Sequence, residues 1–180
     1  KFINEDNTKL IDTRNIFEIE IGKFNGAINP KTKCFREFSK HFNKLKLNKN
    51  DKIAMYCTGG IRCEKASSHL KQIGYKNVSQ LRGGIINYLE HKRSSGKPKK
   101  MQWKGECFVF DNRVTVNKDL DKGKFKQCFG CRVPLSKKDL KSRFYKKGVH
   151  CHHCVDKRSA DQIKKSEMRQ SQIEIYNKIG

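Results

Sequence analysis

Short apolar runs alternate with amphipathic segments through the first half of the sequence. Three runs have the length of buried strands, at 9–12, 53–56 and 78–81. Four segments have the spacing or composition of helices, at 15–21, 35–45, 64–73 and 84–91. Strands that alternate with helices indicate an α/β fold, in which helices cover both faces of a parallel sheet. Such sheets bind ligands at the carboxyl ends of their strands.

The second half of the chain has a different pattern. A strand, a turn at Asp111–Asn112 and a second strand are expected between Trp103 and Val116. A polar terminal helix is expected at 159–178, with Ser159 as its N-cap. The predicted parts are a domain at 1–92, a basic linker at 93–102, a cysteine-rich module at 103–158 and a C-terminal helix at 159–180.

The charge balance narrows the classes of partner. Lys and Arg number 41 against 18 acidic residues, a formal net charge of +23. Nucleic acid, an anionic membrane or an acidic protein can use such an excess, although a Lys- and Asn-rich proteome accounts for part of it. No apolar stretch approaches the length of a membrane span, and no signal-peptide pattern opens the chain. We therefore expect nucleic acid as the partner and no membrane.

Cys57 begins the most informative segment, because it directly follows the apolar run at 53–56 and precedes the helix at 64–73. Backbone N–H groups and the positive end of a helix can converge on sulfur in such a loop and favour the thiolate, the nucleophilic form. A purely structural cysteine is the alternative. The predicted active loop contains Cys57, Thr58, Gly59, Gly60, Ile61, Arg62 and Cys63.

Two side chains of this loop have alternative roles. Arg62 can add positive charge beside the sulfur and bind an anionic group of the substrate, or it can bridge to Asp12 or Glu18. Cys63 can resolve an oxidised Cys57 as a disulfide, or it can simply fill a small position, which we favour. We predict Cys57 and Arg62 as the catalytic pair.

Four further cysteines have the spacing of a metal site. Two C-x-x-C pairs match a common zinc template, and four thiolates would complete a closed tetrahedral shell that folds the module without catalysing a reaction. Reduced, metal-free thiols or a redox pair are the alternatives. The predicted ligands of a structural Zn²⁺ are Cys128, Cys131, Cys151 and Cys154.

The two remaining cysteines, Cys34 and Cys107, lack partners at a useful spacing and are expected to be small buried residues. Cysteines in these patterns are typical of a reducing compartment, the cytoplasm or an organelle matrix.

Basic residues surround the paired cysteines and alternate with aromatic ones. Basic side chains match phosphates, and an exposed aromatic ring can stack on an unpaired base, although each ring alone is better explained as part of a small core. The predicted RNA-binding residues are Lys124, Lys126, Arg132, Lys137, Lys138, Lys141, Arg143, Lys146 and Lys147.

An ordered series of segments resembles the rhodanese-like domains. It comprises Leu10–Arg14, Glu18, Gly26–Asn29, the loop from Cys57 to Arg62, and Leu81–Ile85. A narrower resemblance, to the tRNA uridine hydroxylases, is carried by CTGGIRCEKA at 57–66, GGIINYLE at 83–90 and GECFVFDNRVTV at 105–116.

The resemblance implies a rhodanese-like α/β domain joined to a zinc-stapled module, with Asp12 and Arg14 bracing the sheet. It implies that Cys57 can carry a persulfide, and that the protein uses molecular oxygen to convert the wobble uridine of tRNA to 5-hydroxyuridine. A plain sulfurtransferase and a non-catalytic RNA-binding component of a ribonucleoprotein, such as an organellar ribosome, are the alternatives. The family also implies further elements before Lys1, so the sequence is interpreted as a fragment, a processed chain or a divergent relative.

Overall fold

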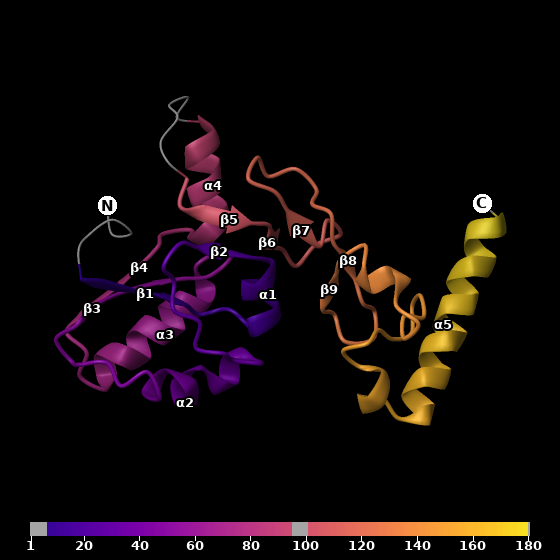
Figure 1. Ribbon diagram of the computed structural model, residues 1–180, viewed down its shortest axis with the longest axis horizontal. Coiled ribbons are helices and arrows are strands. Elements are labelled where there is room, and N and C mark those ends of the chain that lie inside the picture. Colours follow the sequence, from indigo (N-terminus) through magenta and orange to yellow (C-terminus); the bar gives the residue numbers. More distant parts are fainter. Residues whose placement is uncertain (1–6, 95–100, 180) are drawn as a thin grey trace. The chain divides into compact units, whose positions relative to one another are not determined.

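A three-stranded parallel sheet lies at the centre of the N-terminal part of the molecule (Figure 1). In the computed structural model, which describes residues 7–94 and 101–179, the strand order is β1 (Thr8–Asp12), β3 (Lys52–Tyr56), β4 (Asn77–Gln80). Thr8 pairs with Lys52, and Lys52 pairs with Asn77, so the three strands begin level with one another. Their carboxyl ends therefore meet at one edge, with β3 in the middle.

Alternation along β3 sends its side chains into two separate cores. Ile53 and Met55 pack with α2 (Phe38–Asn43) and α3 (Ile61–Gln72) on one face. Ala54 and Tyr56 pack on the other face with Ile85 and Leu89 of α4 (Gly84–Ser94). Both faces of β3 are buried, which explains why all four residues at 53–56 are apolar and do not alternate with polar ones. The predicted α/β fold with helices on both faces is confirmed.

Smaller elements complete the first unit. They are α1 (Ile16–Ile21), β2 (Gly22–Phe24), the 3-10 turn η2 (Phe35–Glu37), β5 (Trp103–Gly105), β6 (Cys107–Phe108) and β7 (Thr115–Val116). β6 and β7 form the expected strand–turn–strand, and the Val114 N–H donates to the Asp111 carbonyl across its turn at 3.0 Å.

The predicted boundary of the cysteine-rich module is wrong by about twenty residues. The chain divides into units at 1–123 and 124–180, so 103–123 belong to the first unit rather than to the module. The cause is Trp103, which pairs with Phe24 in the antiparallel β2–β5 ladder and buries its ring 5.1 Å from the Phe24 ring. The start of the predicted linker is also displaced, because α4 continues to Ser94. Positions 95–100 of that linker lie outside the described residues.

The second unit is built around a small core of sulfur and leucine. Its elements are β8 (Lys126–Gln127), β9 (Pro134–Leu135), the 3-10 turns η3 (Asp139–Lys141) and η4 (Val155–Lys157), and α5 (Ala160–Ile179). Leu135 is fully buried against three of the module's cysteines.

The terminal helix begins as predicted. The Gln162 N–H donates to the Ser159 hydroxyl at 3.3 Å, which is an N-cap bond. Arg158 anchors the start of α5 by donating to the Gly130 carbonyl at 2.8 Å and to the Ser166 hydroxyl at 2.7 Å. Across residues 7–94 and 101–179, no helix has both the length and the apolar character to cross a membrane.

Candidate active site and metal centre

Cys57 lies immediately after the middle strand, at the edge where the strands of a parallel sheet bind ligands. The loop between β3 and α3 is shorter than predicted, because α3 begins at Ile61 rather than at 64. Gly60 makes this possible: it precedes the helix with φ of 101°, a left-handed conformation that favours glycine. Arg62 and Cys63 are therefore fixed on the first helical turn instead of lying in a loop.

Hydrogen bonds converge on the Cys57 sulfur. The thiol of Cys63 donates to it, as do the backbone N–H groups of Cys63 and Gly60, the last at 3.0 Å. These donors, with the charge of Arg62, outweigh the opposing effect of burial and lower the pKa of Cys57 to about 5. The sequence predicted a thiolate here, and the geometry provides the donors that such a thiolate requires.

Cys63 takes a role that neither sequence alternative described. It is fully buried on α3, 3.5 Å from the Thr13 hydroxyl, and the neighbouring Cys57 thiolate raises its pKa. The opposite directions of the two pKa shifts favour a thiolate at Cys57 and a thiol at Cys63. Cys63 acts as a hydrogen-bond donor that favours the ionised form of its neighbour.

Helix α4 holds the carbonyl groups of the same loop. The Ile85 N–H donates to the Cys57 carbonyl at 2.9 Å, and the Ile86 N–H donates to the Thr58 carbonyl at 3.2 Å. Gly84 allows this close approach, because a Cβ atom there would lie 2.5 Å from both carbonyl oxygens. With its carbonyls directed to α4, the loop presents N–H groups to the sulfur.

The Cys57 sulfur is buried, although other residues of its loop are exposed. The Cys57 residue is 2% exposed, whereas Gly59 is exposed and Ile61 is 71% exposed. A reacting atom must therefore enter the loop to reach Cys57.

Arg62 forms the bridge to Glu18 that the sequence offered as its alternative role. Its two terminal nitrogens donate to the two carboxylate oxygens of Glu18, both at 2.7 Å. Glu18 is fully buried and also accepts the Asn15 N–H at the start of α1, at 3.0 Å. One carboxylate thus caps α1 and fixes the guanidinium beside Cys57, so Arg62 supplies charge to the loop from a rigid position.

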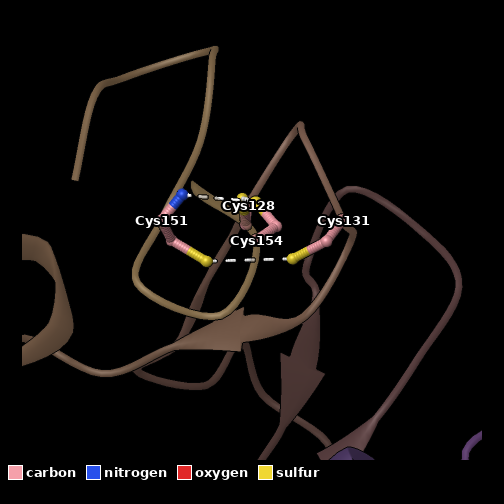
Figure 2. A group of neighbouring side chains, drawn as sticks. All are labelled: Cys128, Cys131, Cys151 and Cys154. Atoms are coloured by element: carbon pink, nitrogen blue, oxygen red, sulfur yellow. Dashed lines mark hydrogen bonds between the residues drawn. The ribbon is translucent and has the colours of Figure 1, made fainter. Parts of the chain in front are cut away.

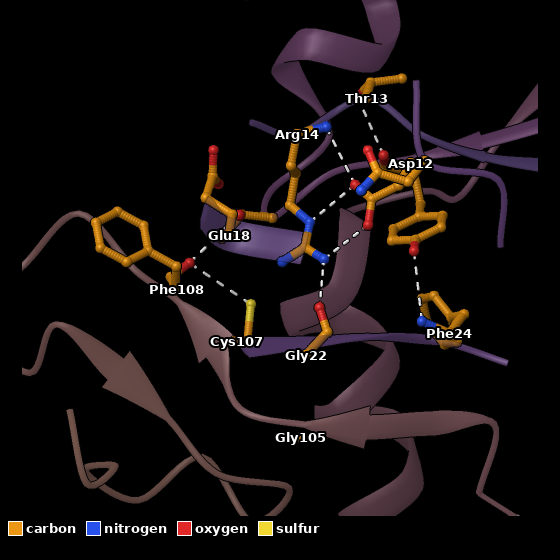
Figure 3. A network of polar contacts seen from close by, with 12 residues as sticks. Asp12, Thr13, Arg14, Glu18, Gly22, Phe24, Gly105, Cys107 and Phe108 are labelled. Atoms are coloured by element: carbon orange, nitrogen blue, oxygen red, sulfur yellow. Dashed lines mark hydrogen bonds and ion pairs between the residues drawn. The ribbon is translucent and has the colours of Figure 1, made fainter. Parts of the chain in front are cut away.

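A second buried ion pair supports the sheet edge (Figure 3). Arg14 donates to the two oxygens of Asp12 at 2.9 and 2.7 Å and to the Gly22 carbonyl at 2.6 Å. Its guanidinium also lies against the rings of Tyr56 and Trp103, at 5.7 and 5.2 Å from their centroids. Arg14 thereby contacts β1, β2, β3 and β5 and holds the ends of these strands together.

The four cysteines of the second unit form a group that can bind a metal ion (Figure 2). All four sulfurs lie within 4.8 Å of one another, although about twenty residues separate the two pairs. Cys128 lies 3.9 Å from Cys154, and Cys131 lies 3.7 Å from Cys151. Hydrogen bonds from the Cys131 thiol and from the backbone of the first pair lower the pKa of Cys128 to about 4, which favours the thiolate that a metal requires.

Every predicted RNA-binding side chain is exposed in the second unit, including Lys124, Lys126 and Arg132. Lys146 pairs with Glu167 of α5 at 2.5 Å, and the guanidinium of Arg143 lies over the ring of Phe144 at 4.6 Å. Exposure is what RNA contact requires, and RNA binding stays a prediction.

Sequence reasoning predicted the hairpin of β6 and β7 but missed its contact with the active loop, and it misplaced one cysteine. The Thr58 hydroxyl donates to the carbonyl of Phe108 in β6 at 3.3 Å. The 105–116 motif was a signal for this hairpin, but its spacing did not indicate contact with the loop. Cys107 is buried as expected, whereas Cys34 is exposed, because it precedes a 3-10 turn at the surface rather than a buried element.

These features define an α/β domain that holds an ionised cysteine at the carboxyl edge of its parallel sheet. The chain belongs to the rhodanese-like domain family, whose family model matches residues 1–91. Over all 180 residues the chain is 49% identical to the tRNA uridine(34) hydroxylase of Pelagibacter ubique, and it spans 58% of that relative's length.

Two solved structures are more distant. A rhodanese-related protein from Thermoplasma volcanium is 27% identical with a TM-score of 0.43, over 54% of this chain and 87% of that one. A rhodanese from E. coli, solved with anions, is 22% identical with a TM-score of 0.41, over 54% of this chain and 98% of that one.

Proposed function

We propose that the chain carries the catalytic and RNA-binding parts of an enzyme that hydroxylates uridine 34 of tRNA to 5-hydroxyuridine. The observation that carries this proposal is the 49% identity to a tRNA uridine(34) hydroxylase, because it extends over the entire chain. It therefore includes both the Cys57 loop and the four-cysteine group, whereas the family match ends at residue 91. A simple rhodanese-like domain would account for the first part only.

In this proposal Cys57 is the reactive group, with the predicted loop residues as its support. Gly60 and Cys63 hold the sulfur ionised through hydrogen bonds, and Arg62 adds positive charge from its fixed position on Glu18. Molecular oxygen is the proposed co-substrate. The loop orients the thiolate toward an entering base, and the surrounding burial limits its contact with water.

We assign the four-cysteine group to a structural Zn²⁺. A tetrahedral ion with Zn–S bonds of about 2.3 Å places its sulfurs about 3.8 Å apart. The two sulfur–sulfur distances between the C-x-x-C pairs, 3.9 Å for Cys128–Cys154 and 3.7 Å for Cys131–Cys151, fit this value. Four protein ligands leave no open position, so the ion would stabilise the module and supply no catalysis.

The module so folded presents the exposed basic side chains that we propose bind tRNA. Each Lys or Arg that neutralises a phosphate releases a counterion, so binding would weaken steeply with salt. Such a reaction on tRNA would take place in the cytoplasm.

The test is nucleoside mass spectrometry of tRNA from cells that lack their own uridine 34 hydroxylation. Complementation with the wild type and with Cys34→Ser is expected to produce 5-hydroxyuridine, because Cys34 is an exposed thiol outside the loop. Cys57→Ser is expected to produce none. Equal amounts of the nucleoside in all strains, or none with the wild type, would remove the proposal.

A sulfurtransferase is the second candidate, because a thiolate that accepts loop N–H groups can also hold a sulfane sulfur. It predicts transfer from thiosulfate to cyanide without oxygen, and it needs no part of the second unit. The 49% identity to a tRNA uridine(34) hydroxylase favours tRNA modification over this candidate and over a non-catalytic ribonucleoprotein component.

A further inference from the structure

A large apolar ring lies in solvent beside the active loop. Phe110 follows β6 and is 75% exposed. Its ring contacts the ring of Phe108 edge-on, with centroids 5.1 Å apart and planes at 87°. Phe108 itself is buried and packs in the same manner on Phe17 at 5.4 Å. Phe110 is thus the outermost of three contacting rings: Phe108 supports it on its buried side, and the rest of the ring is exposed to solvent.

The position of this ring is fixed relative to the reactive cysteine by contacts within the first unit. The Thr58 hydroxyl donates to the Phe108 carbonyl at 3.3 Å, and the guanidinium carbon of Arg62 lies 5.8 Å from the Phe110 ring centroid. Arg62 in turn donates to the Thr58 hydroxyl at 3.4 Å. Phe110 is therefore connected to the active loop directly through Arg62, and indirectly through its neighbour Phe108, whose carbonyl accepts from Thr58.

The turn beyond Phe110 is also closed. Arg113 donates to both carboxylate oxygens of Asp111, with the shortest distance 2.7 Å, and the Val114 N–H closes the turn onto the Asp111 carbonyl. The ring stands on a closed turn rather than on an extended loop.

Exposure of one apolar side chain is ordinary, but a second exposed apolar side chain lies in the active loop itself. Ile61 precedes Arg62 on the first turn of α3 and is 71% exposed. Because Glu18 occupies both terminal nitrogens of Arg62, this guanidinium is poorly placed to capture a phosphate. The exposed side chains of Ile61 and Phe110 are therefore apolar, and the second is aromatic, which suits a flat ring better than a backbone phosphate.

We propose that Phe110 is the stacking platform for the base presented to Cys57, an unpaired pyrimidine of RNA. This inference rests on the proposed function for its substrate. Stacking on a supported, exposed ring would hold the base at the rim of the loop and direct its edge toward the sulfur. Phe110 would then contact the substrate directly, whereas Phe108 and Arg62 position Phe110.

The test compares Phe110→Leu, Phe110→Trp and the control Tyr176→Leu in the full chain. Leucine keeps an apolar side chain but removes the aromatic face, and Tyr176 is an exposed aromatic residue on α5. The probe is a fluorescently labelled uridine hexanucleotide, and its dissociation constant is read by anisotropy. Phe110→Leu is expected to weaken binding by about 5- to 150-fold, the range for loss of one stacked base, with the other two variants near wild type.

The Phe110→Trp variant also reports stacking directly. Its fluorescence is expected to be quenched when the hexanucleotide binds, while the buried Trp103 of the wild type changes little. The same variants are then scored for 5-hydroxyuridine in cellular tRNA, where Phe110→Leu is expected to reduce the nucleoside and Phe110→Trp to restore it.

The outcomes distinguish the stacking role of Phe110 from the proposed hydroxylation of uridine 34. Equal hexanucleotide affinity of the wild type and Phe110→Leu, no binding by the wild type, or an equal loss with Tyr176→Leu would overturn the stacking role. If Phe110→Leu weakens hexanucleotide binding but the deficient cells complemented with the wild-type chain contain no 5-hydroxyuridine, the stacking role stands and the proposed hydroxylation fails.

Discussion

The ionised state of Cys57 gives the sharpest prediction, because it fixes how the thiol reacts as pH changes. Its pKa falls from the ordinary value of 9.0 to about 5. A shift of about four units corresponds to about 5 kcal/mol in favour of the thiolate. At pH 7 such a thiol is about 99% ionised, whereas an ordinary one would be about 1% ionised.

Alkylation by iodoacetamide converts this difference into a rate, because only the thiolate reacts. From pH 5 to pH 7 the rate at Cys57 is expected to rise only about twofold, against about 100-fold for a thiol with a pKa of 9. The reactive form is present above pH 5 and is lost as the pH falls through that value. Trypsin cuts after Lys52 and Arg62, so peptide mass spectrometry separates Cys57 from the other seven cysteines.

The hydrogen bond from Cys63 supplies the matched perturbation. A hydrogen bond to a charged group contributes about 1.5–3 kcal/mol, so Cys63→Ala is expected to raise the inflection by about one to two pH units. Cys63→Ser keeps a donor and is expected to keep the inflection near that of the wild type. A wild-type rate that climbs tenfold per pH unit between 5 and 8, or an alanine variant with an unchanged inflection, would refute this account of the loop.

Three further perturbations test the supports of the two centres. Glu18→Gln removes the buried partner of Arg62 and is expected to cost about 3–5 kcal/mol in urea unfolding, whereas Asp111→Asn, in an exposed pair, changes little. Gly84→Ala places a Cβ 2.5 Å from the Cys57 carbonyl oxygen, so it is expected to slow alkylation of Cys57 and to lower the melting temperature. The control is Gly26→Ala. Gly26 has a similar positive φ but no neighbour within 4 Å, so this variant should keep the wild-type alkylation rate. Cys128→Ser, or a chelator, is expected to remove one metal ion per chain, as measured by native mass spectrometry, and to unfold the second unit. Unfolding is followed by far-ultraviolet circular dichroism, and an unchanged spectrum would contradict the zinc assignment.

Local pattern was enough to predict the sheet and the positions of both chemical centres. The strand at 53–56 is apolar at every position because both faces of the sheet are covered, and Cys57 follows it directly. The paired spacing of the four cysteines likewise predicted one cluster. In each case, neighbouring residues in the sequence determine the result.

Contacts between distant segments account for what the sequence did not indicate. The segment at 103–123 joins the first unit because Trp103 pairs with Phe24, seventy-nine positions earlier, and no local spacing encodes that pairing. The same holds for Phe108, whose carbonyl meets Thr58 across fifty positions. The early start of α3 depends on the left-handed conformation of Gly60. A glycine can adopt this conformation but also many others, so its presence in the sequence did not predict where the helix begins.

The contact between Gly84 and the Cys57 carbonyl has a consequence for how this kind of site can change. A peptide group has two opposite poles, and in this loop α4 occupies one of them, leaving the other for an anion. If the loop peptides were rotated, their carbonyl oxygens would face the sulfur position in place of their N–H groups, and the loop would suit a cation. The preference for a negatively charged sulfur is therefore encoded as much by a glycine twenty-seven residues downstream as by the loop that surrounds it.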